Sequence, residues 1–106
     1  MRIDATPVEF AQIDVDALCE IGLLALAVEA GTLAVTCFRR AAAAEPESPT
    51  IRHNLARSLI LIGDLEGAEA EYREAIRLAP EAPNSYIGLA RVQQSLGLRG
   101  EAVDNV

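Results

Sequence analysis

The side chains that most often carry out chemistry are few in this sequence and are not grouped as a reactive site would require. His53 is the single histidine, so a cluster of histidine metal ligands is excluded. Cys19 and Cys37 lack the C-x-x-C spacing of metal and redox sites, and both lie in apolar surroundings. We interpret the two cysteines as small buried hydrophobic residues. The sequence therefore predicts no catalytic site, no metal and no cofactor.

The charged residues also argue against several classes of function. The net charge is −7, which disfavours nucleic acid as a partner because phosphate binding needs a basic surface. All nine basic residues are arginine, so the chain has neither a Schiff-base lysine nor a phosphate-binding P-loop lysine. Four glutamates between positions 66 and 74 alternate with Arg73 and Arg77, and Glu69 lies four residues before Arg73. This pattern is typical of a solvated helix face.

Residues 49–82 predict two amphipathic helices joined by a tight turn. Apolar and small residues recur at helical spacing over about 50–62 and again over about 65–78. Ser48 and Asp64 stand where N-caps are expected, one before each helix. Such a hairpin has apolar faces that it cannot bury by itself, so we expect it to stack on similar units.

A repeat of 34 residues supplies those units. Residues separated by this offset keep their size class, small for small and large for large. The matching sets include Ala34, Ala68 and Ala102; Phe38, Tyr72 and Val106; Pro46 and Pro80; and Gly22, Ala56 and Ala90. We therefore divide the chain into a leader, 1–14, and a repeat domain, 15–106, whose units are 15–48, 49–82 and an incomplete 83–106.

These units resemble the tetratricopeptide repeat (TPR) family, whose pattern places small and large residues at these positions of a 34-residue helical hairpin. The middle unit carries Leu55, Ala56, Leu59, Ala68, Tyr72, Ala75 and Pro80 at the matching places. One departure is Arg52, which stands where the family prefers tryptophan. The resemblance implies an all-α superhelix, a TPR-like solenoid of about three helix-turn-helix repeats with the third incomplete.

The two ends of the chain are less regular than its middle. In the third unit we expect a helix over 85–96, a turn at Gly97 and a second helix from Gly100, giving six helices in all. The leader is open to two interpretations. Residues 8–13 could form a helical turn, with Phe10 and Ile13 packed on the first unit, or the leader could be disordered.

The resemblance also implies a concave groove lined by the leading helix of each unit, where peptides or helices bind. Arg57 and Arg91 are one repeat apart, and two aligned arginines could bind a carboxylate. The alternative is that both are simply solvated. The residues predicted to contact a protein or peptide partner are Asn54, Arg57, Ile60, Leu61, Ile87 and Arg91.

The first unit is unusually apolar, which suggests a second contact surface. Its leading helix has leucines around most of its circumference, and such a helix is normally covered on all sides. The leader, a partner or a second copy could cover it. We predict self-association through Leu23 and Leu26, giving a possible homodimer. The longest apolar run, 21–28, is too short to span a membrane, and the N-terminus does not resemble a signal peptide. We therefore expect a cytoplasmic protein.

Two functions fit these patterns. The first is an interaction module, a scaffold or adaptor without enzymatic activity, that binds a peptide or helix in its groove. The alternative is a regulatory TPR segment of a larger enzyme whose catalytic domain lies outside this chain.

Overall fold

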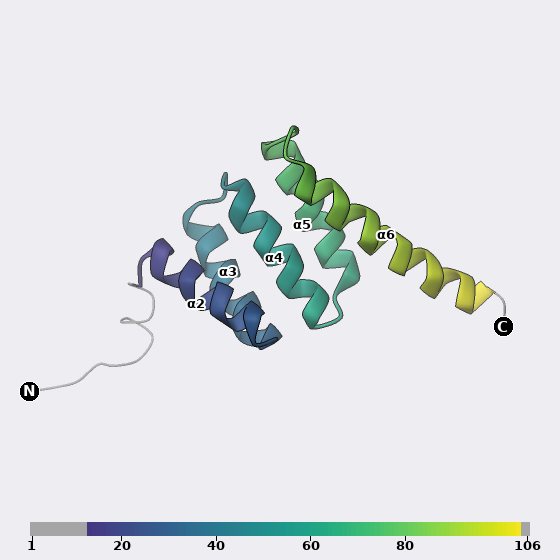
Figure 1. Cartoon of the computed structure of the whole chain (residues 1–106), viewed down its shortest axis with the longest axis horizontal. Coiled ribbons are helices and arrows are strands. Elements are labelled where there is room, and N and C mark those ends of the chain that lie inside the picture. The colour runs from purple at the N-terminus through teal and green to yellow at the C-terminus, as the bar shows by residue number, and fades with distance from the viewer. Residues whose placement is uncertain (1–12, 105–106) are drawn as a thin grey trace, which may run out of the picture.

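The computed structural model describes residues 13–104, and this part of the chain is built from five α-helices without a strand. They are α2 (Val15–Ala27), α3 (Gly31–Ala44), α4 (Pro49–Leu61), α5 (Leu65–Leu78) and α6 (Pro83–Asp104). The helices α2 and α3 form one antiparallel hairpin, α4 and α5 form the next, and α6 packs on α5 (Figure 1). The predicted all-α, stacked-hairpin fold is confirmed.

Side-chain caps fix where three of these helices begin. The Asp14 carboxylate accepts a hydrogen bond from the Ala17 backbone N–H at 2.8 Å at the start of α2. Ser48 Oγ accepts one from Ile51 N–H at 3.3 Å, and Asp64 Oδ1 accepts one from Gly67 N–H at 2.9 Å. The capping roles predicted for Ser48 and Asp64 are therefore confirmed.

The turns inside the two hairpins use the same backbone conformation with different residues. Gly63, between α4 and α5, has φ 84°, and Glu29, between α2 and α3, has φ 58°. Glu29 thus occupies the left-handed region that normally favours glycine. The nearby Gly31 is needed for a different reason. A Cβ added there would lie 2.9 Å from the Leu61 Cβ, so the absent side chain lets α3 begin against the end of α4.

The core lies where the small residues of one helix face the large residues of the next. Ala34, Phe38, Ala56 and Ala68 are fully buried. A Cβ added to Gly22 would lie 2.6 Å from the Phe38 ring, so the close contact of α2 with α3 requires a glycine. The alternation of small and large residues at the repeat offset therefore sets how closely the helices approach.

The predicted turn at Gly97 and second helix from Gly100 are wrong. A single helix, α6, runs through Gly97 and continues to Asp104, so the structure has five helices and not six in its described part. Gly97 is the repeat equivalent of Gly63 but has no positive φ, so the chain does not turn there. Leu98 also lacks the capping side chain that Asp64 supplies, although α3 begins after the equivalent Ala30 without one. Ala90 is accordingly exposed, whereas its repeat equivalent Ala56 is fully buried.

The linkers between the units are held by a side chain of the following helix. Arg52 Nε donates a hydrogen bond to the Pro46 carbonyl at 3.3 Å, and the Tyr86 hydroxyl donates one to the Pro80 carbonyl at 2.7 Å. Arg52 and Tyr86 are repeat equivalents, as are the two prolines. Arg52 therefore has a structural role although it departs from the expected tryptophan.

Phe10 and most of the leader lie outside the described residues. Ile13 is partly buried and packs against the core, as one of the two interpretations expected. No helix in the described range 13–104 is both long enough and apolar enough to cross a membrane.

Candidate functional site

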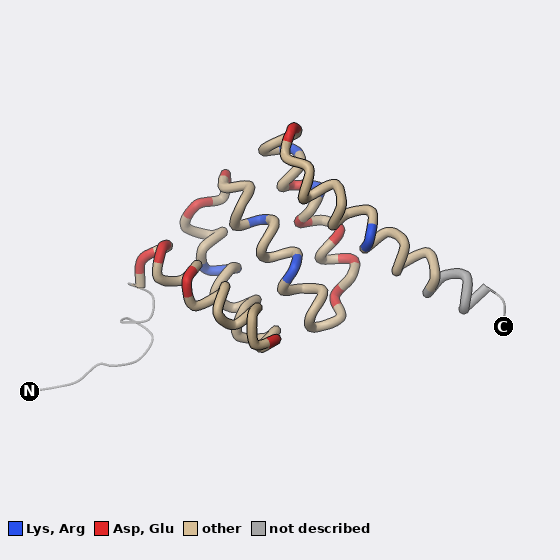
Figure 2. The backbone as a smooth tube through the Cα atoms, in the orientation of Figure 1, with Lys and Arg blue, Asp and Glu red and all other residues tan. Residues whose placement is uncertain are grey.

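A cavity of about 340 Å³ lies between α4 and α6, with Tyr72 of α5 among its lining residues. We call it the groove cavity, and it is lined by His53, Arg57, Tyr72, Asn84, Ile87, Gly88 and Arg91. A side chain at Gly88 would overlap the Tyr72 ring, so this glycine allows α6 to approach α5 closely. Figure 2 shows basic positions on α4 and α6, whereas acidic positions gather along α5.

The two arginines predicted from the repeat spacing both line this cavity. Arg57 is exposed, and its Nη1 donates a hydrogen bond to Asn54 Oδ1 at 3.2 Å. Arg91 is also exposed and has neither an ion pair nor a hydrogen bond with any described residue. Burial raises the pKa of the Tyr72 hydroxyl, while the positive charges of Arg57 and Arg91 act in the opposite direction. Both guanidinium groups therefore act on the same part of the cavity.

Asn54 does not lie where the sequence placed it. The resemblance implied an exposed groove residue, but its side chain is buried, with a relative exposure of 7%. Its side-chain oxygen accepts the hydrogen bond from Arg57, and its backbone carbonyl accepts one from the Ser58 hydroxyl at 2.8 Å. Asn54 thus orients Arg57 and does not line the cavity.

His53 contributes a neutral ring to the cavity. Its Nδ1 lies 3.1 Å from the hydroxyl oxygen of the buried Ser85, and its ring packs edge-on against Tyr72 with centroids 5.4 Å apart. Burial lowers the pKa of His53, and the nearby positive charge of Arg57 lowers it further. In the part of the chain that the structure describes, no three histidine, cysteine or acidic side chains are grouped as metal ligands.

The predicted apolar contacts are only partly brought together. Ile87 lines the groove cavity, and Ile60 lines an adjoining hollow of about 240 Å³ that also contains Arg91. Leu61 is exposed but lines neither; it lies near the start of α3. Tyr72 is a site residue that the sequence did not reveal, because its spacing identified it only as a core residue.

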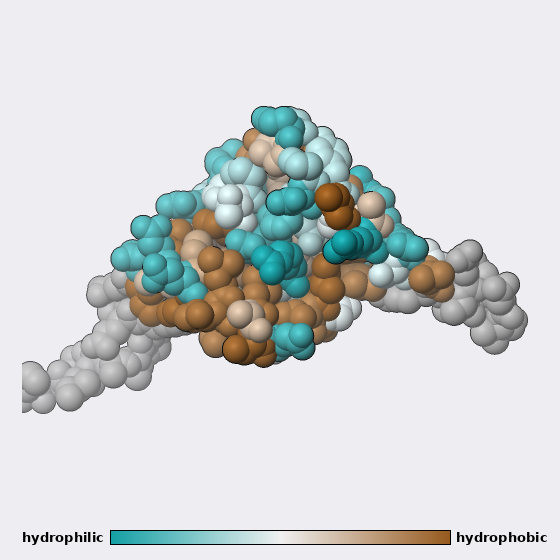
Figure 3. Space-filling model, in the orientation of Figure 1, coloured by the Kyte–Doolittle hydropathy of each residue, from teal (hydrophilic) through white to brown (hydrophobic). Residues whose placement is uncertain are grey.

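The two leucines predicted for self-association also differ in position. Leu23 is exposed, whereas Leu26 is partly buried and packs against the core. Exposed apolar side chains gather where α2 and α4 end, and Figure 3 shows a broad hydrophobic surface along this margin. We call this surface the apolar edge, and it comprises Leu23, Leu24, Val28, Leu33, Leu61 and Ile62.

Comparison with known proteins agrees with this architecture. Residues 49–81 match the family model described as tetratricopeptide repeat. The fold is similar to those of solved structures titled "MamA MSR-1 C2" (TM-score 0.74, 23% identity) and "MamA D159K mutant 1" (TM-score 0.73, 24% identity). The match covers 86% of this chain in both cases, and 52% and 53% of those chains, so this chain spans about half their length. No curated protein matches the sequence.

Proposed function

We propose that this tetratricopeptide-repeat chain is a protein-interaction module that binds an acidic peptide segment in the groove cavity between α4 and α6. The repeat fold is typical of proteins that present a concave surface to a partner. In this proposal Arg57 and Arg91 contact a carboxylate, and Ile87 and Ile60 contact neighbouring apolar side chains. The observation that carries the proposal is that two exposed arginines line one cavity without an acidic partner among the described residues.

The charge distribution supports an acidic ligand. The chain carries a net charge of −7, so a site with two positive charges and no acidic partner differs from its average. Other arginines of the repeat are neutralised locally, since Arg73 pairs with Glu69 and Arg77 pairs with Glu74. Arg57 instead donates a hydrogen bond to a neutral amide, so no carboxylate offsets its positive charge. A guanidinium group binds a carboxylate through two parallel hydrogen bonds, which makes the pair both strong and directional.

The test is charge reversal at both groove arginines. Partners are first captured from a lysate and identified by mass spectrometry, and the segment bound is then titrated by calorimetry. We expect Arg57→Glu with Arg91→Glu to weaken binding by at least about ten- to a hundredfold, because the loss of even one charge-assisted contact costs roughly 1.5–3 kcal/mol. The control is charge reversal at Arg73 and Arg77, which lie on α5 and do not line the cavity.

The stability of both variants is measured alongside, since exposed substitutions usually change it by less than about 0.5 kcal/mol. Equal affinity of the two double variants would show that the groove cavity is not the binding site. The partner would then be sought on the apolar edge.

We propose in addition that the apolar edge mediates self-association of the chain. Apolar patches larger than a few hundred Å² are uncommon on monomers. Three residues of the apolar edge are strongly exposed: Leu23 at 46%, Leu24 at 69% and Val28 at 74%. Light scattering should show a mass that rises with concentration and returns to that of a monomer in Leu23→Glu. Leu98→Glu is the control, because Leu98 is also exposed but lies on α6. A wild-type mass that stays monomeric at every concentration would exclude this proposal.

A further inference from the structure

Two further hollows adjoin the groove cavity, one on each side of it along α4. The first has a volume of about 220 Å³, lies where α4 and α6 begin, and shares His53 and Asn84 with the groove cavity. We call it the Pro49 hollow. The second is the hollow of about 240 Å³ that contains Ile60, and it shares Arg91 with the groove cavity. We call it the Ile60 hollow, and we call the three hollows together the furrow.

The length of the furrow suits a short extended peptide. The step of ten residues from Thr50 to Ile60 covers about 15 Å of α4, because a helix rises about 1.5 Å per residue. An extended peptide rises about 3.3 Å per residue, so five residues cover about the same distance. Its side chains alternate between two sides, and those on one side are about 7 Å apart. Three hollows spread over about 15 Å have a similar spacing, so the first, third and fifth residues of such a peptide would each face one hollow.

The middle of the furrow is its charged part. Arg57 and Arg91 line the groove cavity, and both are exposed. Among the described residues, no acidic side chain lines any of the three hollows. The middle residue of a bound peptide is therefore the one for which a negative charge is favoured.

The two end hollows are mainly apolar, and part of their apolar surface is accessible. Pro49, Ala79 and Ala82 line the Pro49 hollow, and each is partly exposed. In the Ile60 hollow, Ile60 is 38% exposed and Leu65 is partly exposed. An aliphatic side chain placed in either hollow would cover apolar surface that is now in contact with water, which is favourable.

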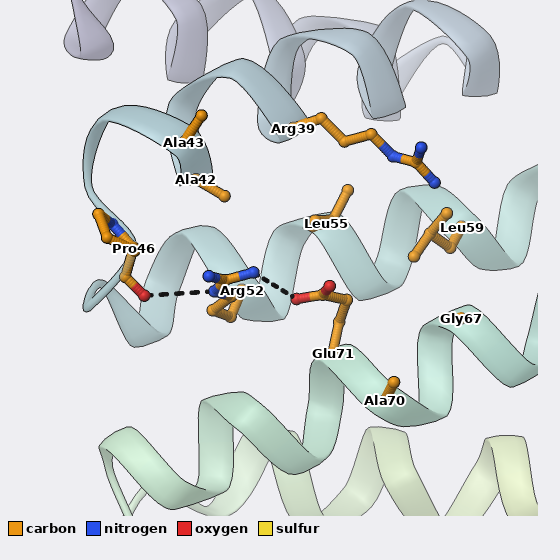
Figure 4. Close-up of a pocket in the computed structure, with 10 residues that line it drawn as sticks. All are labelled: Arg39, Ala42, Ala43, Pro46, Arg52, Leu55, Leu59, Gly67, Ala70 and Glu71. Carbon is orange, nitrogen blue, oxygen red and sulfur yellow. Dashed lines mark hydrogen bonds and ion pairs between the residues drawn. The ribbon is translucent and has the colours of Figure 1, made fainter.

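The opposite face of α4 is built differently. Figure 4 shows Arg52 there, where its Nε donates a hydrogen bond to the Pro46 carbonyl and its Nη1 donates one to Glu71 Oε1 at 3.1 Å. Arg52 thus connects α4 to the preceding linker and to α5. The hollow of about 430 Å³ on this face is lined by Leu55 and Leu59, but these are core residues only 3% and 2% exposed. A peptide has little apolar contact to gain on this face.

We propose that the furrow binds an extended segment of five residues in which a central acidic residue has an aliphatic residue two positions away on each side. This inference rests on the proposed function, because the acidic residue occupies the groove cavity. Its carboxylate pairs with Arg57 and Arg91, and the aliphatic side chains occupy the Pro49 and Ile60 hollows. The second and fourth side chains point away from the furrow into solvent. Because the end hollows are both apolar and similar in volume, the pattern is the same in either direction of the peptide.

The proposal can be tested by titrating acetylated and amidated pentapeptides into the ¹⁵N-labelled chain. The matching probe is acetyl-Leu-Ser-Glu-Ser-Leu-amide, whose only charge is the glutamate. We expect saturable changes in the amide signals of Thr50, Gly88 and Ser95, one from each hollow. The signals of Ala42 and Ala70, on the opposite face, should not change. The isomer acetyl-Leu-Glu-Ser-Ser-Leu-amide has the same composition, but its glutamate lies on the other side of an extended chain. It should bind at least about tenfold more weakly, because it loses a charge-assisted contact.

A second comparison tests the aliphatic positions. The probe acetyl-Ser-Ser-Glu-Ser-Ser-amide should bind at least about tenfold more weakly than the matching probe, because it covers no apolar surface in the end hollows. Ile60→Ser should weaken the matching probe by about three- to tenfold and leave the serine probe unchanged. The matched control is Leu61→Ser, because Leu61 is 41% exposed but lines none of the three hollows.

Equal affinity of the matching probe and its isomer would overturn the spacing. Equal affinity of the matching and serine probes, or equal effects of Ile60→Ser and Leu61→Ser, would overturn the aliphatic positions. If no probe changes the furrow signals, the furrow is not a peptide site. The glutamine counterpart of the matching probe tests the proposed function separately. If it binds as tightly as the glutamate probe, the acidic ligand of the groove cavity is refuted. If it binds more weakly but the isomer and serine comparisons fail, the acidic ligand is retained and only the five-residue pattern is rejected.

Discussion

The turn between α2 and α3 holds Glu29 at φ 58°, and replacing this residue with glycine should stabilise the fold. A side chain in the left-handed region crowds the adjacent carbonyl oxygen, which costs roughly 1–2 kcal/mol. Glycine removes that cost but loses about 0.5–1 kcal/mol through its greater freedom in the unfolded chain. The Glu29 side chain is exposed and makes no hydrogen bond or ion pair with the described residues. The net expectation for Glu29→Gly is a gain of roughly 0.75 kcal/mol, within a range of about 0–1.5 kcal/mol.

The middle repeat supplies the inverse experiment. Gly63 has φ 84°, and a Cβ added there would meet no atom within 4 Å. The cost of Gly63→Ala is therefore conformational alone, and the same two terms with opposite sign give roughly 0.75 kcal/mol, within about 0–1.5 kcal/mol. Urea denaturation measures both changes, and the slope of the transition should stay constant. For a domain of this size 1 kcal/mol corresponds to about 4–8 °C in melting temperature.

A third glycine tests whether the last unit is one continuous helix. Gly97 lies inside α6 without a positive φ, and a Cβ there would also meet nothing within 4 Å. Gly97→Ala should therefore stabilise the chain, since alanine is favoured over glycine in a helix by about 0.5–1 kcal/mol. Destabilisation by Gly97→Ala would indicate a turn at this position. A lower melting temperature for Glu29→Gly would refute the strain assigned to Glu29.

Two further predictions concern packing and pH. Ala68 is fully buried between helices, so Ala68→Leu should lower the free energy of unfolding by about 1–3 kcal/mol through overpacking. The control, Ala90→Leu on the exposed face of α6, should change it by less than about 0.5 kcal/mol. Equal effects of the two variants in urea denaturation would contradict this packing. Burial and the positive charge of Arg57 lower the pKa of His53 in the folded state below its unfolded value of about 6.5. The unfolded chain therefore takes up a proton at a higher pH than the folded chain. The contribution of the neutral His53 ring to stability is present above about pH 6.5 and is lost as pH falls through the folded pKa. Wild type should lose stability over this pH range more steeply than His53→Gln, and parallel pH profiles in urea denaturation would contradict the shift.

The sequence alone was sufficient for the helices and turns of the first two hairpins. Their apolar stripes, and the caps at Ser48 and Asp64, are interactions between residues a few positions apart, so they can be recognised without knowledge of the fold. The repeat offset also predicted that Arg57 and Arg91 face the same way, because they hold equivalent positions on stacked helices, and both line one cavity. The third unit was predicted wrongly because the repeat pattern was extended to Gly97, where the backbone stays helical and does not adopt the positive φ of the equivalent Gly63.

Only the tertiary structure decided which polar side chains are free to bind. Asn54 is buried under Arg57, and the Tyr72 ring lines the groove cavity because α6 approaches it closely at Gly88. The helices α3 and α5 both pack on α4, and no Cα atom of one lies within 8 Å of a Cα atom of the other. Helical periodicity specifies which face of a helix is apolar, but it does not specify how far apart two neighbouring helices lie. Cavities form between neighbouring helices. The distance between two helices is set by the volumes of side chains contributed from several helices at once.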